Sequence, residues 1–206
     1  MNKVCIAIPT RDGNIYFELA LRLVQWTNQR DIPVELIFQP FSAPVDHARN
    51  DIVRRFMATK CTHLLMIDDD IVPPFEALER LVKHNKDIVA AICPLIGPNK
   101  KGEMITTWNA FYKTKNGYAP WGSCPGLQKV AAVGTGCIMI KRGVFDYCCR
   151  FTTEYDKNTG IKTKGEDISF CDQVAEHGFK IFADFKLECK HIKACNLLEL
   201  QPLYED

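Results

Sequence analysis

The sequence of 206 residues has no apolar run near the roughly 20 residues that a membrane-spanning helix needs. It has no Cys-x-x-Cys pair among its ten cysteines, which argues against a structural zinc site. It also has no N-terminal signal segment, because the short apolar run 4–9 follows one lysine and leads directly into Arg11 and Asp12. These absences predict a soluble protein with reduced cysteines in the cytoplasm.

Glycine is missing where a phosphate-binding loop would need it. The first apolar run is followed by Thr10-Arg11-Asp12-Gly13, which holds one glycine. A Rossmann dehydrogenase needs G-x-G-x-x-G at this point, so that class is excluded. A nucleotidyltransferase of related fold normally has a glycine-rich loop there as well, so it stays only as an alternative.

The hydrophobic pattern alternates between the periods of strands and helices. Buried strands are predicted at 4–9, 34–38, 62–67, 87–93, 130–133, 137–140 and 180–185. Helices are predicted at 16–26, 45–59, 75–84 and 167–177. This alternation is typical of an α/β fold with a mostly parallel central sheet flanked by helices. Because the chain is too short for two enzyme domains, we expect a single domain, 1–206.

The middle of the chain differs from the rest in pattern and charge. Between 94 and 127 regularity is lost among glycine, proline, lysine and aromatic residues, so we expect a long functional loop there. The net charge of the chain is only +1, yet segment 100–165 holds eleven basic and four acidic residues. That segment is therefore expected to face an anionic partner or solvent.

Three consecutive aspartates, Asp68-Asp69-Asp70, end a buried strand. Like charges a few ångströms apart repel and raise one another's pKa, so the triplet calls for a cation. In open α/β sheets ligands bind beyond the carboxyl ends of the strands, which is where these carboxylates are expected. Hard oxygen ligands completed by phosphates suit Mg²⁺ or Mn²⁺. The alternative is that Asp70 caps the next helix, which explains only one of the three carboxylates.

The triplet and its surroundings resemble the GT-A glycosyltransferases, in particular the family-2-type and galactosyltransferase-like enzymes. Besides the D-x-D motif at 68–70, Ile8-Pro9-Thr10-Arg11 resembles the strand end beside the nucleoside, and Ala48-Arg49-Asn50 resembles the segment one helix before the motif. The resemblance implies a GT-A (nucleotide-diphospho-sugar transferase) fold with a nucleotide-binding half, 1–99, and an acceptor-binding half, 100–206. It implies donor contacts from Pro9, Thr10, Arg11, Arg49, Asn50, Asp68 and Asp69, and metal ligation by Asp68 and Asp70.

Three later segments extend the resemblance. Gly134-Thr135-Gly136 is similar to the segment that lines the donor-sugar pocket, and Gly165-Glu166-Asp167 to the motif whose carboxylates face the acceptor. His191 stands where such enzymes often place a histidine ligand to the metal. The resemblance makes Asp167 the catalytic base and Glu166 its partner. The alternatives are a tight turn for the glycines, first-turn acids favoured by the helix dipole, and a surface basic cluster around His191.

These residues together predict a metal-dependent transferase that moves a sugar from a nucleotide-diphosphate sugar, with a UDP-sugar as the expected donor, to an acceptor hydroxyl with inversion. The metal, Mn²⁺ or Mg²⁺, would neutralise the leaving diphosphate. A non-catalytic nucleotide-sugar-binding module is the alternative from another class. The basic middle segment, interleaved with aromatics such as Trp108 and Tyr118, is compatible with an anionic acceptor, of which nucleic acid carrying a hydroxyl-bearing modified base is one case.

Overall fold

The computed structural model describes residues 2–41, 43–98, 101–122, 124–147 and 149–193. The helices are α1 Phe17–Asn28, α2 Val45–Met57, α3 Ala77–His84 and α4 Glu166–Glu176, with a 3-10 helix η1 at Arg142–Tyr147. The central strands are β1 Val4–Pro9, β2 Val34–Gln39, β3 His63–Ile67, β5 Ile88–Ile92, β10 Leu127–Val130, β12 Cys137–Lys141 and β15 Ile181–Glu188. The smaller strands are β4 Ile71–Val72, β6 Pro94–Pro98, β7 Met104–Trp108, β8 Ala110–Thr114, β9 Gly117–Pro120, β11 Ala132–Val133, β13 Glu154–Tyr155, β14 Lys162–Lys164 and β16 Lys190–His191.

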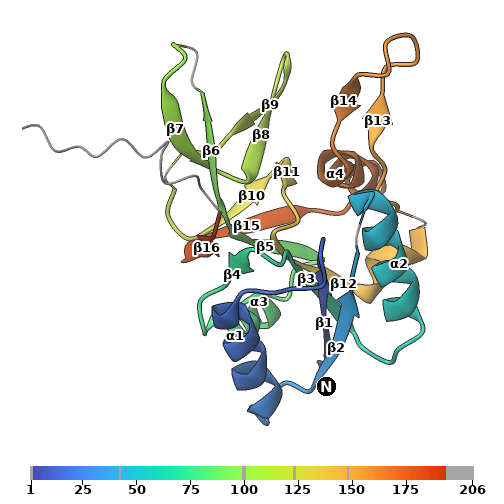
Figure 1. Ribbon diagram of the computed structural model, residues 1–206, viewed down its shortest axis with the longest axis vertical. Helices are drawn as coiled ribbons and strands as arrows, with labels where there is room; N and C mark the ends of the chain where they lie inside the picture. The colour runs from blue at the N-terminus through green and yellow to red at the C-terminus, as the bar shows by residue number, and fades with distance from the viewer. Residues whose placement is uncertain (1, 42, 99–100, 123, 148, 194–206) are drawn as a thin grey trace, which may run out of the picture.

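The seven central strands form one sheet in the order β10-β15-β5-β12-β3-β1-β2. Strand β1 pairs in parallel with β2 and with β3, and β5 pairs in parallel with β15. The strands of the second half of the sequence interleave with those of the first, since β12 lies between β3 and β5. Figure 1 shows this sheet below a group of hairpins. The predicted α/β class is confirmed.

The sheet is mixed, so the expectation of a mostly parallel sheet is wrong. Strand β12 runs antiparallel to both β3 and β5, and β10 runs antiparallel to β15. A parallel neighbour needs a crossover of about a dozen residues or more to carry the chain back to the other end of the sheet. Residues 134–136 connect β11 to β12 directly at the carboxyl end of β3, so β12 enters the sheet from that end and runs in the opposite direction.

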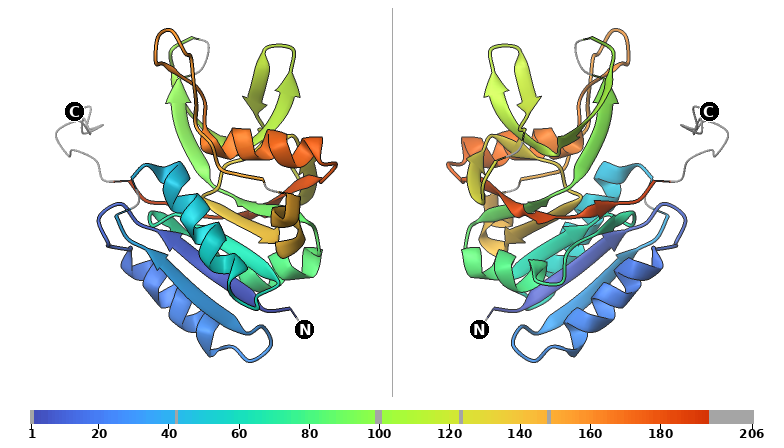
Figure 2. Two further views of the ribbon diagram at one scale, coloured as in Figure 1. Left: turned by 90° about the vertical axis from the view of Figure 1, so that its right-hand side faces the viewer. Right: turned by 90° about the vertical axis from the view of Figure 1, so that its left-hand side faces the viewer.

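Two hydrophobic clusters cover the two faces of the sheet. On one face α1 and α3 pack through residues such as Trp26 and Leu78, and on the other α2, η1 and α4 pack through residues such as Phe56 and Phe170. Figure 2 shows α2 and α4 on the same side of the sheet. Because both faces are covered, strands β1, β3 and β5 are buried along their whole length, as their uninterrupted apolar runs predict.

The four predicted helices are present, with ends that differ by a few residues from those predicted. The largest difference is at α3, which begins at Ala77 and not at Phe75. Pro73 and Pro74 lack backbone N–H groups, and the first bond of this turn runs from the N–H of Ala77 to the carbonyl of Pro74. Of the described helices, none is both long enough and apolar enough to span a membrane.

The expectation of a long irregular loop from 94 to 127 is wrong. Strands β6 and β7 form one antiparallel hairpin, and β8 and β9 form a second with Gly117 in a positive-φ conformation at 114°. Asn116-Gly117 is a hairpin signal that the glycine, proline and lysine content of the segment obscured. A third hairpin joins β13 to β14. All three rise from the same end of the sheet (Figure 1).

Candidate active site

The candidate site lies where β1 and β3 end. These two strands are parallel neighbours in the sheet, so Arg11, just after β1, and Asp69, just after β3, meet at the same edge. The backbone N–H of Arg11 donates to Oδ2 of Asp69 over 3.1 Å. The backbone N–H of Asp68 donates to the carbonyl of Gly136 over 3.1 Å, which fixes the turn before β12 against the aspartates. Two predicted segments are thus brought together here.

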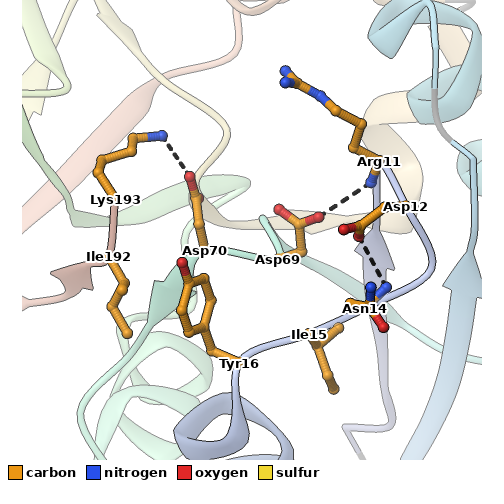
Figure 3. A pocket seen from close by; sticks show the side chains of 9 residues that line it. All are labelled: Arg11, Asp12, Asn14, Ile15, Tyr16, Asp69, Asp70, Ile192 and Lys193. Carbon is orange, nitrogen blue, oxygen red and sulfur yellow. Dashed lines mark hydrogen bonds and ion pairs between the residues drawn. The ribbon is translucent and has the colours of Figure 1, made fainter. Parts of the chain in front are cut away.

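Three cavities meet at this edge and share their walls. The outer cavity, about 510 Å³, contains Asn14, Tyr16 and Lys193 in its wall and is drawn in Figure 3. The middle cavity, about 280 Å³, shares with it Arg11, Asp69, Asp70 and Lys193. The inner cavity, about 180 Å³, shares with the middle one Arg49, Asp68 and His191. The shared walls make one continuous trough across the carboxyl ends of the strands.

Each of the three aspartates has its own partner in the trough. Asp68 accepts from Nη2 of Arg49 over 3.0 Å, Asp69 accepts from the backbone of Arg11, and Asp70 pairs with Lys193. Burial, followed by the backbone of Arg11 as an opposing effect and the charges of Asp70 and Asp68, raises the pKa of Asp69. The repulsion that the sequence predicts is therefore present, and cationic groups and N–H donors offset it.

Asp70 and His191 are brought together by pairing of the two short strands β4 and β16. Nε2 of His191 lies 3.3 Å from Oδ2 of Asp70, and Nδ1 lies 2.7 Å from the carbonyl oxygen of Pro94. A carbonyl oxygen only accepts, so Nδ1 carries the hydrogen of that bond and a neutral ring presents its lone pair on Nε2 toward the carboxylate. Two acceptors that face each other call for a cation between them.

This pair fits part of a divalent-metal site. A metal-bound histidine usually donates its other ring N–H to a carbonyl or carboxylate, as His191 does to Pro94. Within the described ranges, no group of three or more His, Cys, Asp or Glu side chains is arranged to hold a metal. A metal at Asp70 and His191 would therefore need most of its ligands from a bound diphosphate and water, as Mg²⁺ sites at phosphates commonly do.

Arg49 links the two ends of the trough from a buried position on α2. Its side chain is only 4% exposed, and it pairs with Asp68 at 3.0 Å and with Glu166 at 3.4 Å. Burial lowers its pKa, but Asp68 and Glu166 raise it by more, so the guanidinium stays charged. Its Nη1 is buried without a hydrogen-bond partner in the part of the chain that the structure describes. An orphaned cationic donor in the wall of two cavities suits an oxygen atom of a ligand.

The inner cavity has a wall of close backbone contacts. A Cβ atom on Gly134 would lie 3.2 Å from Cβ of Asn109 and 3.6 Å from Oδ2 of Asp167. A Cβ on Gly136 would lie 3.0 Å from Sγ of Cys93. Both glycines have ordinary negative φ, so lack of space and not backbone conformation requires them. The turn and the close-approach explanations of this segment therefore both apply.

Asp167 lies in the first turn of α4 with a carboxylate in the inner cavity. Its Oδ1 accepts the N–H of Ile168 over 2.8 Å, and its Oδ2 faces Gly134. Burial is the first cause and the charge of Glu166 the second that raise the pKa of Asp167, against smaller opposing effects from Arg49 and Lys162. A carboxylate with a raised pKa is a stronger base than an exposed one.

Comparisons with known proteins add to this geometry. No family model matches the sequence, and no curated protein matches it by sequence. The structure resembles the crystal structure of A197 from STIV, with a TM-score of 0.59 and 20% identity over 94% of this chain and 87% of that one. It also resembles GalNAc-T7 with UDP, GalNAc and Mn²⁺, with a TM-score of 0.56 and 11% identity over 95% of this chain and 44% of that one. The chain has a GT-A-type fold. Identities this low establish the fold alone.

Two predicted donor contacts hold backbone instead of lining the trough. The hydroxyl of Thr10 accepts the N–H of Gly13 over 2.9 Å and closes the turn after β1. The amide of Asn50 donates to the carbonyl of Phe151 over 2.7 Å and accepts its N–H over 3.0 Å. The other predicted site residues line at least one of the three cavities: Pro9, Arg11, Arg49, Asp68, Asp69, Asp70, Gly134, Thr135, Gly136, Glu166, Asp167 and His191.

Sequence reasoning missed several residues of the trough. Asn109 is 4% exposed, and its Oδ1 accepts the N–H of Cys93 over 2.8 Å, which joins β5 to the inner cavity. Tyr16 lines the outer cavity from the residue before α1. Lys193 was visible only as a basic neighbour of His191. A polar residue inside an aromatic stretch, as Asn109 is, was the one available signal for the inner wall.

Proposed function

We propose that this protein is a metal-dependent glycosyltransferase that transfers a sugar from a nucleotide-diphosphate sugar to an acceptor hydroxyl with inversion. The observation that carries this proposal is the trough, because its three cavities follow one another in the order that such a donor requires. A nucleoside fits the outer cavity, a diphosphate the middle one beside Asp70 and His191, and a sugar the inner one beside Asp167. The GT-A-type fold supports the same class.

The cationic groups around the middle cavity support a diphosphate there. Arg11 and Lys193 line both the outer and the middle cavity, and the free Nη1 of Arg49 lies in the wall between the middle and inner ones. These groups bind and orient the two phosphates and stabilise charge that develops on the leaving group. GalNAc-T7 is described with UDP and Mn²⁺, which favours a UDP-sugar as the donor class to test first.

Asp70 and His191 are the residues that would hold Mn²⁺ or Mg²⁺, with Asp68 beside them in the middle cavity. When bound, such an ion supplies Lewis-acid stabilisation of the diphosphate. The protein's own part is to orient the ligands: the carbonyl of Pro94 fixes the imidazole of His191, and the pairing of β4 with β16 fixes its distance from Asp70. Lys193 holds the carboxylate of Asp70 when neither ligand is bound.

Asp167 is the proposed base. Its carboxylate takes the proton of the acceptor hydroxyl while the hydroxyl oxygen forms a bond to the anomeric carbon of the sugar. The bond from that carbon to the diphosphate oxygen breaks, and its electron pair leaves with the diphosphate. A single in-line displacement inverts the anomeric carbon. Glu166, held by Arg49 at 3.4 Å and Lys162 at 3.9 Å, positions this wall and balances the arginine.

The acceptor approaches from the side of the three hairpins that rise above the sheet (Figure 1). Their lysines include Lys115 and Lys157, and exposed aromatic residues on them include Tyr112 and Tyr155. Such a surface suits an anionic acceptor that has planar or sugar rings, and nucleic acid with a hydroxyl-bearing base is one member of that class. Transfer that weakens steeply with added salt would support a polyanionic acceptor.

Donor binding and chemistry are tested together by incubating the protein with Mn²⁺ and a panel of nucleotide sugars. We expect one donor to bind by calorimetry and to release nucleoside diphosphate, and we expect Asp167→Asn to keep the binding and lose the release. Binding without release by the wild-type protein with any acceptor mixture would instead assign a non-catalytic nucleotide-sugar module. If no donor in the panel binds, the proposal fails.

A further inference from the structure

A fourth cavity, of about 510 Å³, lies outside the trough, and we propose that it binds a phosphate-bearing ligand with a planar body, that is, a nucleotide unit. This rear cavity is walled by the β8–β9 hairpin, the end of β10, the C-terminal half of α4 and the start of β15. Its volume lies within the range of ordinary small-molecule sites. The proposal does not depend on the glycosyltransferase function.

The rear cavity carries a net positive charge. Three lysines from three separate segments line it, Lys113 on β8, Lys129 on β10 and Lys180 just before β15. Within the described ranges, neither Lys129 nor Lys180 has a carboxylate within ion-pair distance. The two ammonium groups are therefore available to a ligand, and phosphate is the common anion that accepts from several lysines at once.

The single carboxylate of the rear cavity does not cancel this charge. Asp172 accepts a short hydrogen bond from the hydroxyl of Tyr118 and pairs with Lys164 at 3.2 Å and with Lys113 at 3.7 Å. Burial opposes these contacts, but the bonds from Tyr118 and Lys164 lower the pKa of Asp172, so it stays ionised and paired. Since Lys164 does not line the cavity and already balances Asp172, the three lining lysines keep a net excess.

The floor of the rear cavity is apolar, which selects the body of the ligand. Val130 and Ile181 are buried beneath it, and the half-buried ring of Phe179 lines it together with Tyr118. A bare phosphate would reach the lysines and leave this floor against water. A ligand that joins a phosphate to a flat ring covers both, because bases stack on aromatic side chains without regard to their sequence.

The rear cavity is separate from the trough. On α4, Asp167 reaches the inner cavity, whereas Asp172 and Ala175 line the rear one, and eight helical residues span about 12 Å. Between the two cavities Sγ of Cys171 contacts the backbone of Val133 at 3.5 Å, and both residues are buried. Stabilisation of the α4 dipole accounts for lysines near its end, and edge protection accounts for Lys129, but neither requires an apolar floor between them.

The experiment uses the full chain with ¹³C-labelled isoleucine methyl groups, in EDTA. Ile181 reports on the rear cavity and Ile15 on the outer cavity of the trough, so one NMR spectrum separates the two sites. The probes are AMP, a single-stranded DNA hexanucleotide and inorganic phosphate. The variants are K129E/K180E, the milder K129Q/K180Q, and K157E as a control in the exposed β13–β14 turn.

We expect AMP to shift the Ile181 signal saturably and phosphate to bind at least tenfold more weakly. Both double variants should weaken AMP binding at Ile181, K129E/K180E by at least tenfold, with Ile15 unaffected and K157E like the wild type. A hexanucleotide that binds more tightly than AMP identifies nucleic acid as the source, and one that does not identifies free nucleotide. The absence of a saturable Ile181 shift, a shift that survives in both double variants, or equal binding of phosphate and AMP would overturn the proposal.

Discussion

Nε2 of His191 lies 3.3 Å from Oδ2 of Asp70, although 121 residues separate the two in the sequence. The pairing of two strands of only two residues each, β4 and β16, creates this contact. The imidazole is held from behind by Pro94 at the first residue of β6, so strand, hairpin and aspartate motif are fixed relative to one another. The first two predictions concern this pair.

Replacing Asp70 by asparagine should abolish metal-dependent donor binding. The amide keeps the shape of the side chain but loses the charge that a divalent cation needs, so UDP should bind no more tightly with Mn²⁺ than without it. We expect a loss of Mn²⁺-dependent affinity of more than about tenfold in calorimetry. Asp87→Asn is the matched control, because Asp87 pairs with Lys141 at the opposite end of the sheet. An unchanged Mn²⁺ dependence in Asp70→Asn would assign the metal elsewhere.

Replacing Lys193 by methionine should have opposite effects on the two ligands of the middle cavity. The ammonium group of Lys193 occupies Oδ2 of Asp70, so its removal should tighten Mn²⁺ binding by about a few-fold, which electron paramagnetic resonance measures in the absence of nucleotide. UDP without metal should bind more weakly, because a cation beside the diphosphate is lost. Lys190→Met is the control, since Lys190 pairs with Glu18 outside the trough. Weaker Mn²⁺ binding in Lys193→Met would contradict the competition.

Asp167 should set the acidic limb of the pH profile. A base acts only when deprotonated, and the raised pKa of Asp167 means that kcat/KM should fall with decreasing pH at values above the ordinary aspartate range near pH 4. Lys162 lowers that pKa, so Lys162→Met should move the limb to higher pH. Asp167→Asn should reduce transfer by about 10²–10⁴-fold with donor binding intact. An unmoved limb in Lys162→Met would remove Asp167 as the titrating group.

The same substitution should stabilise the fold at neutral pH. Because the pKa of Asp167 is higher in the folded chain than in the unfolded one, the folded state binds more protons between these two values, and stability falls as pH rises through them. Asp167→Asn removes this penalty, so its Tm should exceed that of the wild type at pH 7 and approach it in acid. A lower Tm at pH 7 would show that the carboxylate is structurally required.

Gly165 should tolerate no side chain. A Cβ atom there would lie 2.7 Å from Oδ1 of Asp167, so Gly165→Ala must displace the carboxylate. We expect kcat to fall by about 10²-fold, because a misplacement of about 1 Å at a reacting group costs that much, and UDP affinity to stay within twofold. Gly97→Ala is the control, since a Cβ atom on Gly97 meets nothing within 4 Å and its φ is not positive. Equal activity of the two variants would argue against Asp167 as base.

The parts of the fold that periodicity encodes could be predicted from the sequence. Buried runs such as 62–67 gave strands, and the apolar spacing in 45–59 gave α2, because both faces of the sheet are covered and each element is buried along a regular pattern. The direction of β12 could not be predicted, since it depends on which end of the sheet the chain enters. The hairpins were missed because half-exposed strands alternate weakly among prolines and glycines.

For the site, short motifs predicted which residues gather but not which atoms they engage. Arg49, Asp68 and Glu166 all line the trough, yet the sequence gave no sign that one guanidinium joins the two carboxylates. Asn50 lies next to Arg49 on α2 and points to Phe151, because neighbouring helix residues face about 100° apart. Lys193 and Asn109 lie in the site through tertiary pairing alone, which local patterns do not record.

The hairpins are joined to the trough at their bases and not at their tips. The carbonyl of Pro94 holds His191, Asn109 holds the backbone beside β5, and Asn50 holds the chain before β13. Two of these three anchors use main-chain atoms of the hairpin segments, which any residue type supplies. The turns beyond them can therefore be lengthened, exchanged or grafted while the donor end keeps its geometry. Such a division makes the recognised substrate an interchangeable module on a constant chemical base.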